Sequence, residues 1–307
     1  VRALAVSSDD KWIVSGGDDC VVKVWDLKWR RLGFNLEGHQ QPILAVAWTH
    51  DQKRLISAGK DNGIRVWDVD SKSLQQTLRV YPLPIRSIVV SRDDKYVLSG
   101  GEDKTLRIWN LDSGIQELLL EGHKSSIRAI AVRNDNAKIV TGGDDRLVII
   151  WDLDERKREC TFSGHQNWVI SVAFMPDGES ILSVSEDGCA KVWSLVKNQE
   201  LLSVKGTISF LQAATITKDG KKVIFGGNNA NIETWKIETS KMKIRRRQDK
   251  SSKTALQDRE DETNSQGISH NQWIQRIGLS GGLIKVPAIE QTHDAHRTDT
   301  KDQEEDQ

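Results

Sequence analysis

Tryptophan recurs in this sequence at a fixed interval of 42 residues. The interval holds without a slip over six copies: Trp25, Trp67, Trp109, Trp151, Trp193 and Trp235. A fixed period of about 20 to 50 residues is typical of proteins that stack copies of one small structural unit. We therefore expect one unit used six times, and we expect function to lie where the copies differ.

Each 42-residue unit carries two turn signals with short apolar runs between them. The first signal is an aspartate: Asp9, Asp51, Asp93, Asp135, Asp177 and Asp219. The second stands ten residues later: Asp19, Asp61, Asp103, Asp145, Asp187 and Asn229. Runs such as VVKVW and LRIW alternate with a period of two, which is typical of strands. Short strands joined by tight turns at this spacing predict the blade of a β-propeller.

Composition excludes several classes of protein. The 44 basic and 44 acidic side chains cancel, which argues against a nucleic-acid or membrane-surface protein. No apolar run approaches the ~20 residues that cross a bilayer. Three scattered cysteines favour a reducing, intracellular compartment, the cytoplasm first and the nucleus as the alternative. The start at Val1, without an initiator methionine, suggests a fragment or a processed product.

Two dipeptides identify the family that the repeats resemble. Gly-His precedes three inner runs, at His39, His123 and His165, and Trp-Asp ends the third run of three units. This pair at a period of ~40–45 residues is the signature of WD40-repeat β-propellers. The resemblance, over about residues 1–240, implies an all-β propeller of six visible four-stranded blades, or six blades of a seven-bladed ring. The expected propeller covers 1–244, with blades at about 1–36, 37–78, 79–120, 121–162, 163–204 and 205–244.

The resemblance also implies a hydrogen-bonded set of four side chains inside each blade, made by a histidine, a hydroxyl, an aspartate and the tryptophan. The complete sets are His39, Ser57, Asp61 and Trp67; His123, Thr141, Asp145 and Trp151; and His165, Ser183, Asp187 and Trp193. Partial sets are Ser15, Asp19 and Trp25; Ser99, Asp103 and Trp109; and Trp235 alone. Blade three has Tyr81 in place of histidine, and blade six has Phe225 in place of the hydroxyl. Blade six is therefore expected to be the loosest.

In this family the narrower upper face carries the residues three and five after the histidine and the residue before the second turn aspartate. On that face we expect a partner to contact Trp168, Ile170, Glu186, Phe210, Leu44, Lys60, Arg2, Arg86 and Arg128. Three of the arginines have an acid in the same blade, which predicts surface ion pairs with Asp18, Glu102 and Asp144. Alternatively, the arginines anchor a partner.

Blade five differs, because Glu186 has no arginine of its own and stands near Trp168, Ile170 and Phe210. An acid beside aromatic and apolar side chains would suit a peptide that carries lysine or arginine next to an apolar residue. The alternative is that Trp168 only covers a loop.

These features favour a non-catalytic scaffold that binds other proteins or peptides within a multiprotein complex. A histidine, serine and aspartate set repeated in blade after blade is a structural device rather than a catalytic triad. The histidines stand one to a blade and the cysteines do not cluster, so we expect neither metal nor cofactor. One alternative is a C-terminal sensor propeller of a larger signalling protein, similar to fungal NACHT proteins. A ubiquitin-ligase substrate receptor is disfavoured, because the arginine that such receptors often carry just past Trp-Asp is absent.

After Trp235 the sequence becomes charged and aperiodic. Residues 245–307 are too poor in apolar side chains to fold alone, so a disordered tail is expected. Within it, His270 and Trp273 repeat the spacing of His165 and Trp168, so one alternative for 269–286 is the start of a decayed seventh blade, although no turn aspartate or Trp-Asp follows.

Overall fold

The computed structural model describes residues 1–79, 83–206, 211–217, 219–227, 232–238, 243–247 and 277–278. All regular elements of these residues are β-strands. No helix in the described residues has the length and apolarity that a bilayer crossing needs.

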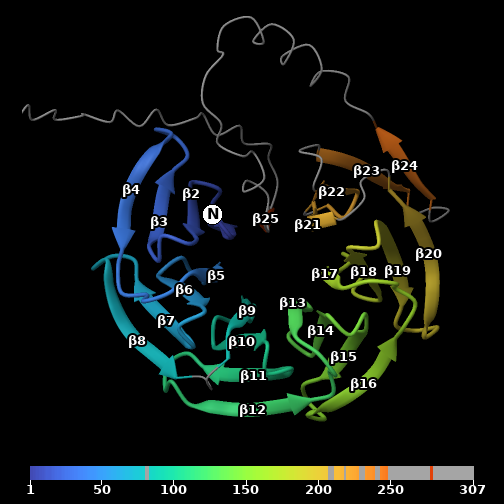
Figure 1. The fold of residues 1–307 in the computed structure, drawn as a ribbon, viewed down its shortest axis with the longest axis horizontal. Helices are drawn as coiled ribbons and strands as arrows, with labels where there is room; N and C mark the ends of the chain where they lie inside the picture. Colours follow the sequence, from blue (N-terminus) through green and yellow to red (C-terminus); the bar gives the residue numbers. More distant parts are fainter. Residues whose placement is uncertain are drawn as a thin grey trace, which may run out of the picture.

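Six blades, each built from four consecutive strands, follow one another in chain order around the centre (Figure 1). Blade one contains β1 (Ala3–Val6), β2 (Trp12–Gly16), β3 (Val22–Asp26) and β4 (Arg31–Leu36). Blade two contains β5 (Ile43–Trp48), β6 (Arg54–Gly59), β7 (Gly63–Asp68) and β8 (Ser73–Arg79). Blade three contains β9 (Ile85–Val90), β10 (Tyr96–Gly101), β11 (Thr105–Asn110) and β12 (Gln116–Glu121).

The remaining blades repeat this pattern. Blade four contains β13 (Ile127–Val132), β14 (Lys138–Gly143), β15 (Val148–Asp152) and β16 (Lys157–Phe162). Blade five contains β17 (Val169–Phe174), β18 (Ser180–Ser185), β19 (Cys189–Ser194) and β20 (Gln199–Lys205). Blade six contains β21 (Leu211–Ile216), β22 (Lys222–Gly227), β23 (Ile232–Glu238) and β24 (Lys243–Arg247). This arrangement confirms the all-β propeller that the period predicts.

The first strand of each blade lies near the axis and the fourth lies at the rim (Figure 1). Small residues fill the crowded inner positions, and Ala45, Ala129 and Ala213 are all buried. Native packing density leaves little room where the blades converge, so small side chains are required there.

The core lies between blades rather than within any one of them. Each cluster of buried apolar side chains draws on two consecutive blades, as Val66 of blade two and Ile88 of blade three illustrate. A single blade therefore cannot bury its own faces, and stability depends on neighbours, as in other repeat proteins.

The C-terminal part differs from the sequence-based boundaries in two places. The outer strand β24 extends to Arg247, past the expected limit at 244. Within the segment 269–286, the described residues form β25 (Ile277–Gly278), which pairs in parallel with β1 in the sheet of blade one. The strand β25 also contacts β21, so it lies between the inner strands of blades one and six. These two residues therefore extend the sheet of blade one, and the other tail residues lie outside the described ranges.

Candidate interaction surface

Three blades contain the complete side-chain sets, and the structure brings each set together. In blade two, His39 Nδ1 lies 2.8 Å from Asp61, and His39 Nε2 lies 2.6 Å from Ser57 Oγ. Trp67 Nε1 donates to the same hydroxyl at 2.7 Å. These contacts are consistent with a Ser57 hydroxyl that donates to Nε2 and a protonated Nδ1 that donates to the Asp61 carboxylate. The set thus links β6, β7, the turn between them and the approach to β5, the first strand of the blade.

Blades four and five repeat this network with similar distances. His123 contacts Asp145 at 2.8 Å and Thr141 at 2.7 Å, and the Trp151 indole donates to Thr141 at 2.8 Å. In blade five, His165 contacts Asp187 at 3.0 Å and Ser183 at 2.8 Å. The Trp193 indole donates to Ser183 at 2.7 Å.

The hydroxyls of these sets are closed to substrates. Ser57, Thr141 and Ser183 have no exposed surface, so no substrate reaches their oxygens. The described residues also hold no cluster of three or more potential metal ligands. These sets therefore act as structural links.

The aspartates of these sets are held in the ionised form. Burial opposes ionisation of Asp61, but hydrogen bonds from His39 and Gln40 and the charge of Arg65 lower its pKa to about 2. The pKa values of Asp145 and Asp187 are also lowered, because hydrogen bonds from histidine and from backbone N–H groups outweigh their burial.

Blade three, where Tyr81 replaces the histidine, uses a side chain that the sequence analysis missed. Tyr81 lies outside the described residues, but Arg107 is buried and its Nε donates to Asp103 at 3.0 Å. Trp109 still donates to Ser99 at 3.0 Å. The signal was an arginine four residues after the turn aspartate, a spacing that also gives the Arg65–Asp61 ion pair of blade two.

The end blades keep less of the network. In blade one Trp25 donates to Ser15 at 2.8 Å, and Lys23 pairs with Asp19. In blade six Phe225 packs edge-on against Trp235, with ring centroids 4.4 Å apart. The Trp235 indole donates to Glu233 of its own strand at 3.1 Å, so that bond does not link strands.

The upper face, where the inner strands begin, carries the expected ion pairs within blades. Arg2 meets Asp18 at 2.5 Å, Arg86 meets Glu102 at 2.6 Å, and Arg128 meets Asp144. Lys60 is exposed on the same face. The hydrogen bond from Arg2 is the main cause of the lowered pKa of Asp18, and the charge of Lys60 adds to it.

For two residues the prediction of a contact with a partner was wrong. Ile170 and Leu44 are buried, and Ile170 belongs to the core cluster between blades five and six. Leucine and isoleucine cannot extend past the neighbouring blade as the arginines at the equivalent positions do. Both are therefore core residues, while Phe210 lies outside the described residues.

Trp168 is an exposed aromatic side chain on a loop with several backbone anchors. The residue is 40% exposed, yet its carbonyl oxygen accepts the N–H of Glu186 at 3.0 Å. The Asn167 carbonyl accepts the Ser185 hydroxyl at 2.9 Å, and the Gln166 N–H donates to Asp187 at 2.8 Å. The aspartate that serves the internal network of blade five therefore also fixes the loop that presents Trp168.

A charged group from the neighbouring blade stacks on this indole. The Arg128 guanidinium lies 4.1 Å from the ring centre of Trp168 while it also pairs with Asp144. Burial raises the pKa of Glu186, Arg128 opposes this shift, and Asp144 adds to it. Arg128 therefore interacts electrostatically with both Asp144 and Glu186. It does so beside the exposed ring of Trp168. We name Trp168, Arg128, Asp144 and Glu186 the blade 4–5 cluster.

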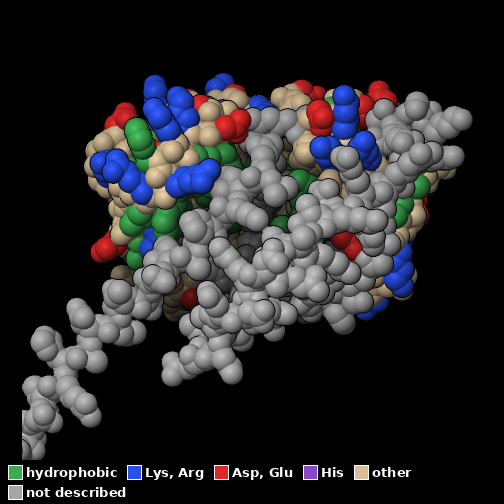
Figure 2. Space-filling view, turned by 90° about the horizontal axis from the view of Figure 1, so that it is seen from above, with side chains coloured by type: hydrophobic (Ala, Val, Ile, Leu, Met, Phe, Trp, Pro, Cys, Tyr) green, Lys and Arg blue, Asp and Glu red, His purple; other side chains and the backbone are tan. Residues whose placement is uncertain are grey.

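Neither sign of charge dominates the described surface on the side that Figure 2 displays. Figure 2 shows basic and acidic side chains interspersed over the described surface on the side that it displays. This agrees with the formal net charge of zero.

Comparison with known proteins supports the interpretation of the repeats. The profile of the family described as "WD domain, G-beta repeat" matches residues 1–26, 30–68, 72–110, 114–152 and 156–194. One similar curated protein is the ribosome biogenesis protein BOP1 homolog of Dictyostelium discoideum, 35% identical over 48 residues. That match covers 16% of this chain and 6% of the relative. With five matched repeats and six observed blades, the chain belongs to the WD40-repeat family of β-propellers.

Proposed function

We propose that this protein is a non-catalytic interaction scaffold that binds a peptide segment of a partner protein at the blade 4–5 cluster. The observation that carries the proposal is the exposed Trp168 ring beside two carboxylates that share one guanidinium. Aromatic side chains that are exposed yet fixed by their surroundings are frequent anchors of protein interfaces.

The charges of the cluster favour a positively charged ligand group. Glu186 and Asp144 exceed the single charge of Arg128. Burial raises the pKa of Glu186, Arg128 opposes this rise, and Asp144 adds to it. A lysine or arginine from a partner would neutralise Glu186 and would stack on the free area of the Trp168 ring. An apolar neighbour in the peptide would cover the rest of the indole.

The site is also preorganised. Because the carbonyl of Trp168 and that of Asn167 are both hydrogen-bonded to the end of β18 and the turn that follows it, little conformational entropy remains to be lost on binding. Specificity would come from a few residues of one blade pair placed on a frame that all blades share.

We also propose that the protein acts inside the cell as a member of a multiprotein complex. Cys20, Cys160 and Cys189 carry free thiols. Burial raises the pKa of Cys160 to about 11, which keeps this thiol protonated and unreactive. Fractionation of cells that express the tagged protein tests the compartment, and recovery in the secreted fraction would contradict it.

The binding proposal is tested with an array of octapeptides that carry lysine, arginine, glutamine or glutamate between apolar residues. We expect the purified chain to retain the lysine and arginine peptides, and Trp168→Ala to weaken them at least about tenfold. Trp29→Ala is the matched control, because Trp29 is 62% exposed but lies just after β3, at the edge of blade one. Equal binding of glutamine and lysine peptides, or equal losses in the two tryptophan variants, would refute the proposal.

A further inference from the structure

The lower face, where the inner strands end, carries a second repeated device. Each inner strand is followed by a turn, and the fourth residue of that turn has a positive φ between 58° and 66°. These residues are Asp10, Gln52, Asp94, Asn136, Gly178 and Gly220.

In blades three and four the side chain of this turn residue accepts hydrogen bonds from the turn of the preceding blade. The Asp94 carboxylate accepts the backbone N–H of His50 at 2.7 Å and that of Asp51 at 2.8 Å. The Asn136 side-chain oxygen accepts the backbone N–H of Arg92 at 2.8 Å. An acceptor oxygen from one blade thus satisfies a backbone donor of the blade before it.

This hydrogen bond between neighbouring blades is missing between blades four and five. Gly178 stands where Asp94 and Asn136 stand in their blades, and it has no side chain to supply an acceptor. The backbone N–H of Asn134, equivalent to those of His50 and Arg92, forms no hydrogen bond with any described residue. A β-carbon at Gly178 would lie 3.8 Å from the nearest atom, the Arg133 Cδ, so the space beside this donor is open.

The next junction differs, although it also has a glycine. A β-carbon at Gly220 would lie 2.4 Å from the ring of Pro176, so Pro176 already fills that position. Among the described junctions with a glycine, only that between blades four and five leaves the acceptor position open.

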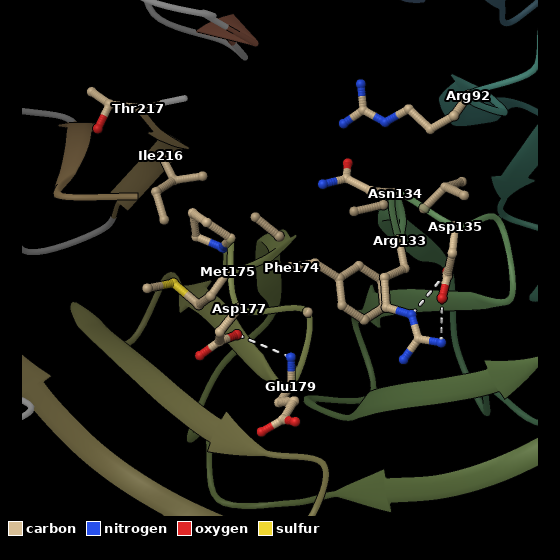
Figure 3. Close-up of a pocket in the computed structure, with 15 residues that line it drawn as sticks. Arg92, Arg133, Asn134, Asp135, Phe174, Met175, Asp177, Glu179, Ile216 and Thr217 are labelled. Atoms are coloured by element: carbon tan, nitrogen blue, oxygen red, sulfur yellow. Dashed lines mark hydrogen bonds and ion pairs between the residues drawn. The ribbon is translucent and has the colours of Figure 1, made fainter. Parts of the chain in front are cut away.

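A cavity of about 680 Å³ lies at this place (Figure 3). Its walls include Arg92 and Asn134 on one side and the apolar Phe174, Met175 and Ile216 on another. A second break in the repeat contributes to it. The first turn residue is Ser7, Thr49, Ser91 and Thr217 in four blades but Arg133 and Met175 in blades four and five.

Arg92 supplies a positive charge that is oriented but not neutralised by an acid. Its guanidinium contacts His50 Nε2 at 3.1 Å, and Asp94 holds His50 Nδ1 at 2.8 Å. Arg92 forms no ion pair with any described residue, whereas Arg133 is paired with Asp135 at 2.7 Å. The carboxylates of Asp177 and Glu179 lie across the cavity from Arg92 (Figure 3).

From these contacts we infer that the cavity binds an aspartate or glutamate side chain of a partner peptide, next to an apolar residue. The carboxylate would take the place that Asp94 occupies one junction earlier, and would accept the Asn134 N–H and the Arg92 guanidinium. The neighbouring apolar side chain would cover Phe174, Met175 and Ile216. This site lies opposite the blade 4–5 cluster and would take an acid at Arg92 and Asn134, away from Asp177 and Glu179, so one propeller would bridge two different partner segments.

The test is selection of a random octapeptide phage library on the purified chain, with subtraction on Gly178→Asn. Asparagine tolerates this φ, as Asn136 does at 62°, and it restores the internal acceptor. We expect peptides that bind the wild-type chain but not this variant to carry aspartate or glutamate beside an apolar residue. Arg92→Gln, or the matching amide in the peptide, should weaken these peptides about tenfold or more.

Two control variants separate this site from other effects. Lys95→Gln removes an exposed cation from the same turn as Arg92, and Glu186→Gln alters the upper face, so both should keep full binding of these peptides. Recovery of the same peptides on wild type and on Gly178→Asn would overturn the inference, as would subtracted peptides without an acid. If Gly178→Asn fails to fold by circular dichroism, Arg92→Gln decides, and unchanged binding by that variant overturns the inference.

Discussion

A few buried hydroxyl groups each serve two partners within a blade. Ser57 accepts a hydrogen bond from Trp67 and contacts His39, and both aromatic side chains are buried around it. A buried donor or acceptor that loses its partner costs about 1–3 kcal/mol, more than a typical exposed bond contributes.

Ser57→Ala should therefore lower the free energy of unfolding by about 1–3 kcal/mol, because it leaves two buried nitrogens unpaired. Urea denaturation followed by tryptophan fluorescence measures this change. Ser163→Ala, at an exposed serine, is the control and should have almost no effect. Equal stability of the two variants would show that the hydroxyl does not hold the blade together.

The lowered pKa of Asp61 predicts a particular response to acid. Its pKa is about 2 in the folded chain against an ordinary value of 3.8, so its ionised form stabilises the fold above pH 3.8. That contribution should disappear as the pH falls from about 4 towards 2. Asp61→Asn should be less stable than wild type at pH 7, and the difference should shrink over this interval. Urea denaturation at several pH values checks this, and a difference that stays constant would rule out the proposed role of the charge.

At the scale of elements, the turns of the lower face join neighbouring blades as well as consecutive strands. Asp94 links blade three to two backbone donors and one imidazole of blade two, whereas Asn136 makes one such bond to blade three. The strength of a blade junction should therefore depend on this turn residue.

Asp94→Ala should destabilise the protein by about 1–3 kcal/mol, and Asn136→Ala should cost less because fewer donors lose their acceptor. Hydrogen exchange of the turn at 49–53 should accelerate in the Asp94 variant alone. Equal exchange in both variants would contradict the assignment of this turn residue as a link between blades.

Sequence periodicity predicted the strands and the turns, because each recurs in phase over 42 residues, and the family resemblance implied the three complete side-chain sets. It did not predict that Arg107 would be buried against Asp103, since that contact belongs to one blade only. The family pattern also placed Leu44 and Ile170 on the surface, where they are in fact buried. That prediction used only their position in the repeat and did not consider the length of their side chains. The stacking of Arg128 on Trp168 joins two blades, and such contacts depend on the geometry of the ring.

At the scale of the whole molecule, the blades share a frame and differ in what they present. The inner strands follow one another around the ring, and β25 lies between β1 and β21 (Figure 1). Blades four and five carry both the blade 4–5 cluster on the upper face and the open junction on the lower face. We therefore expect recognition to depend on the residues that break the repeat.

Charge reversal at Glu186 tests most directly whether the blade 4–5 cluster selects the bound peptide by its charge. Calorimetry would measure the binding of a lysine peptide and of its glutamate counterpart to wild type and to Glu186→Lys. We predict that wild type prefers the lysine peptide and that Glu186→Lys prefers the glutamate peptide, with a change in relative affinity of about tenfold or more. The same preference in both proteins would show that the blade 4–5 cluster does not set specificity, and would contradict the account.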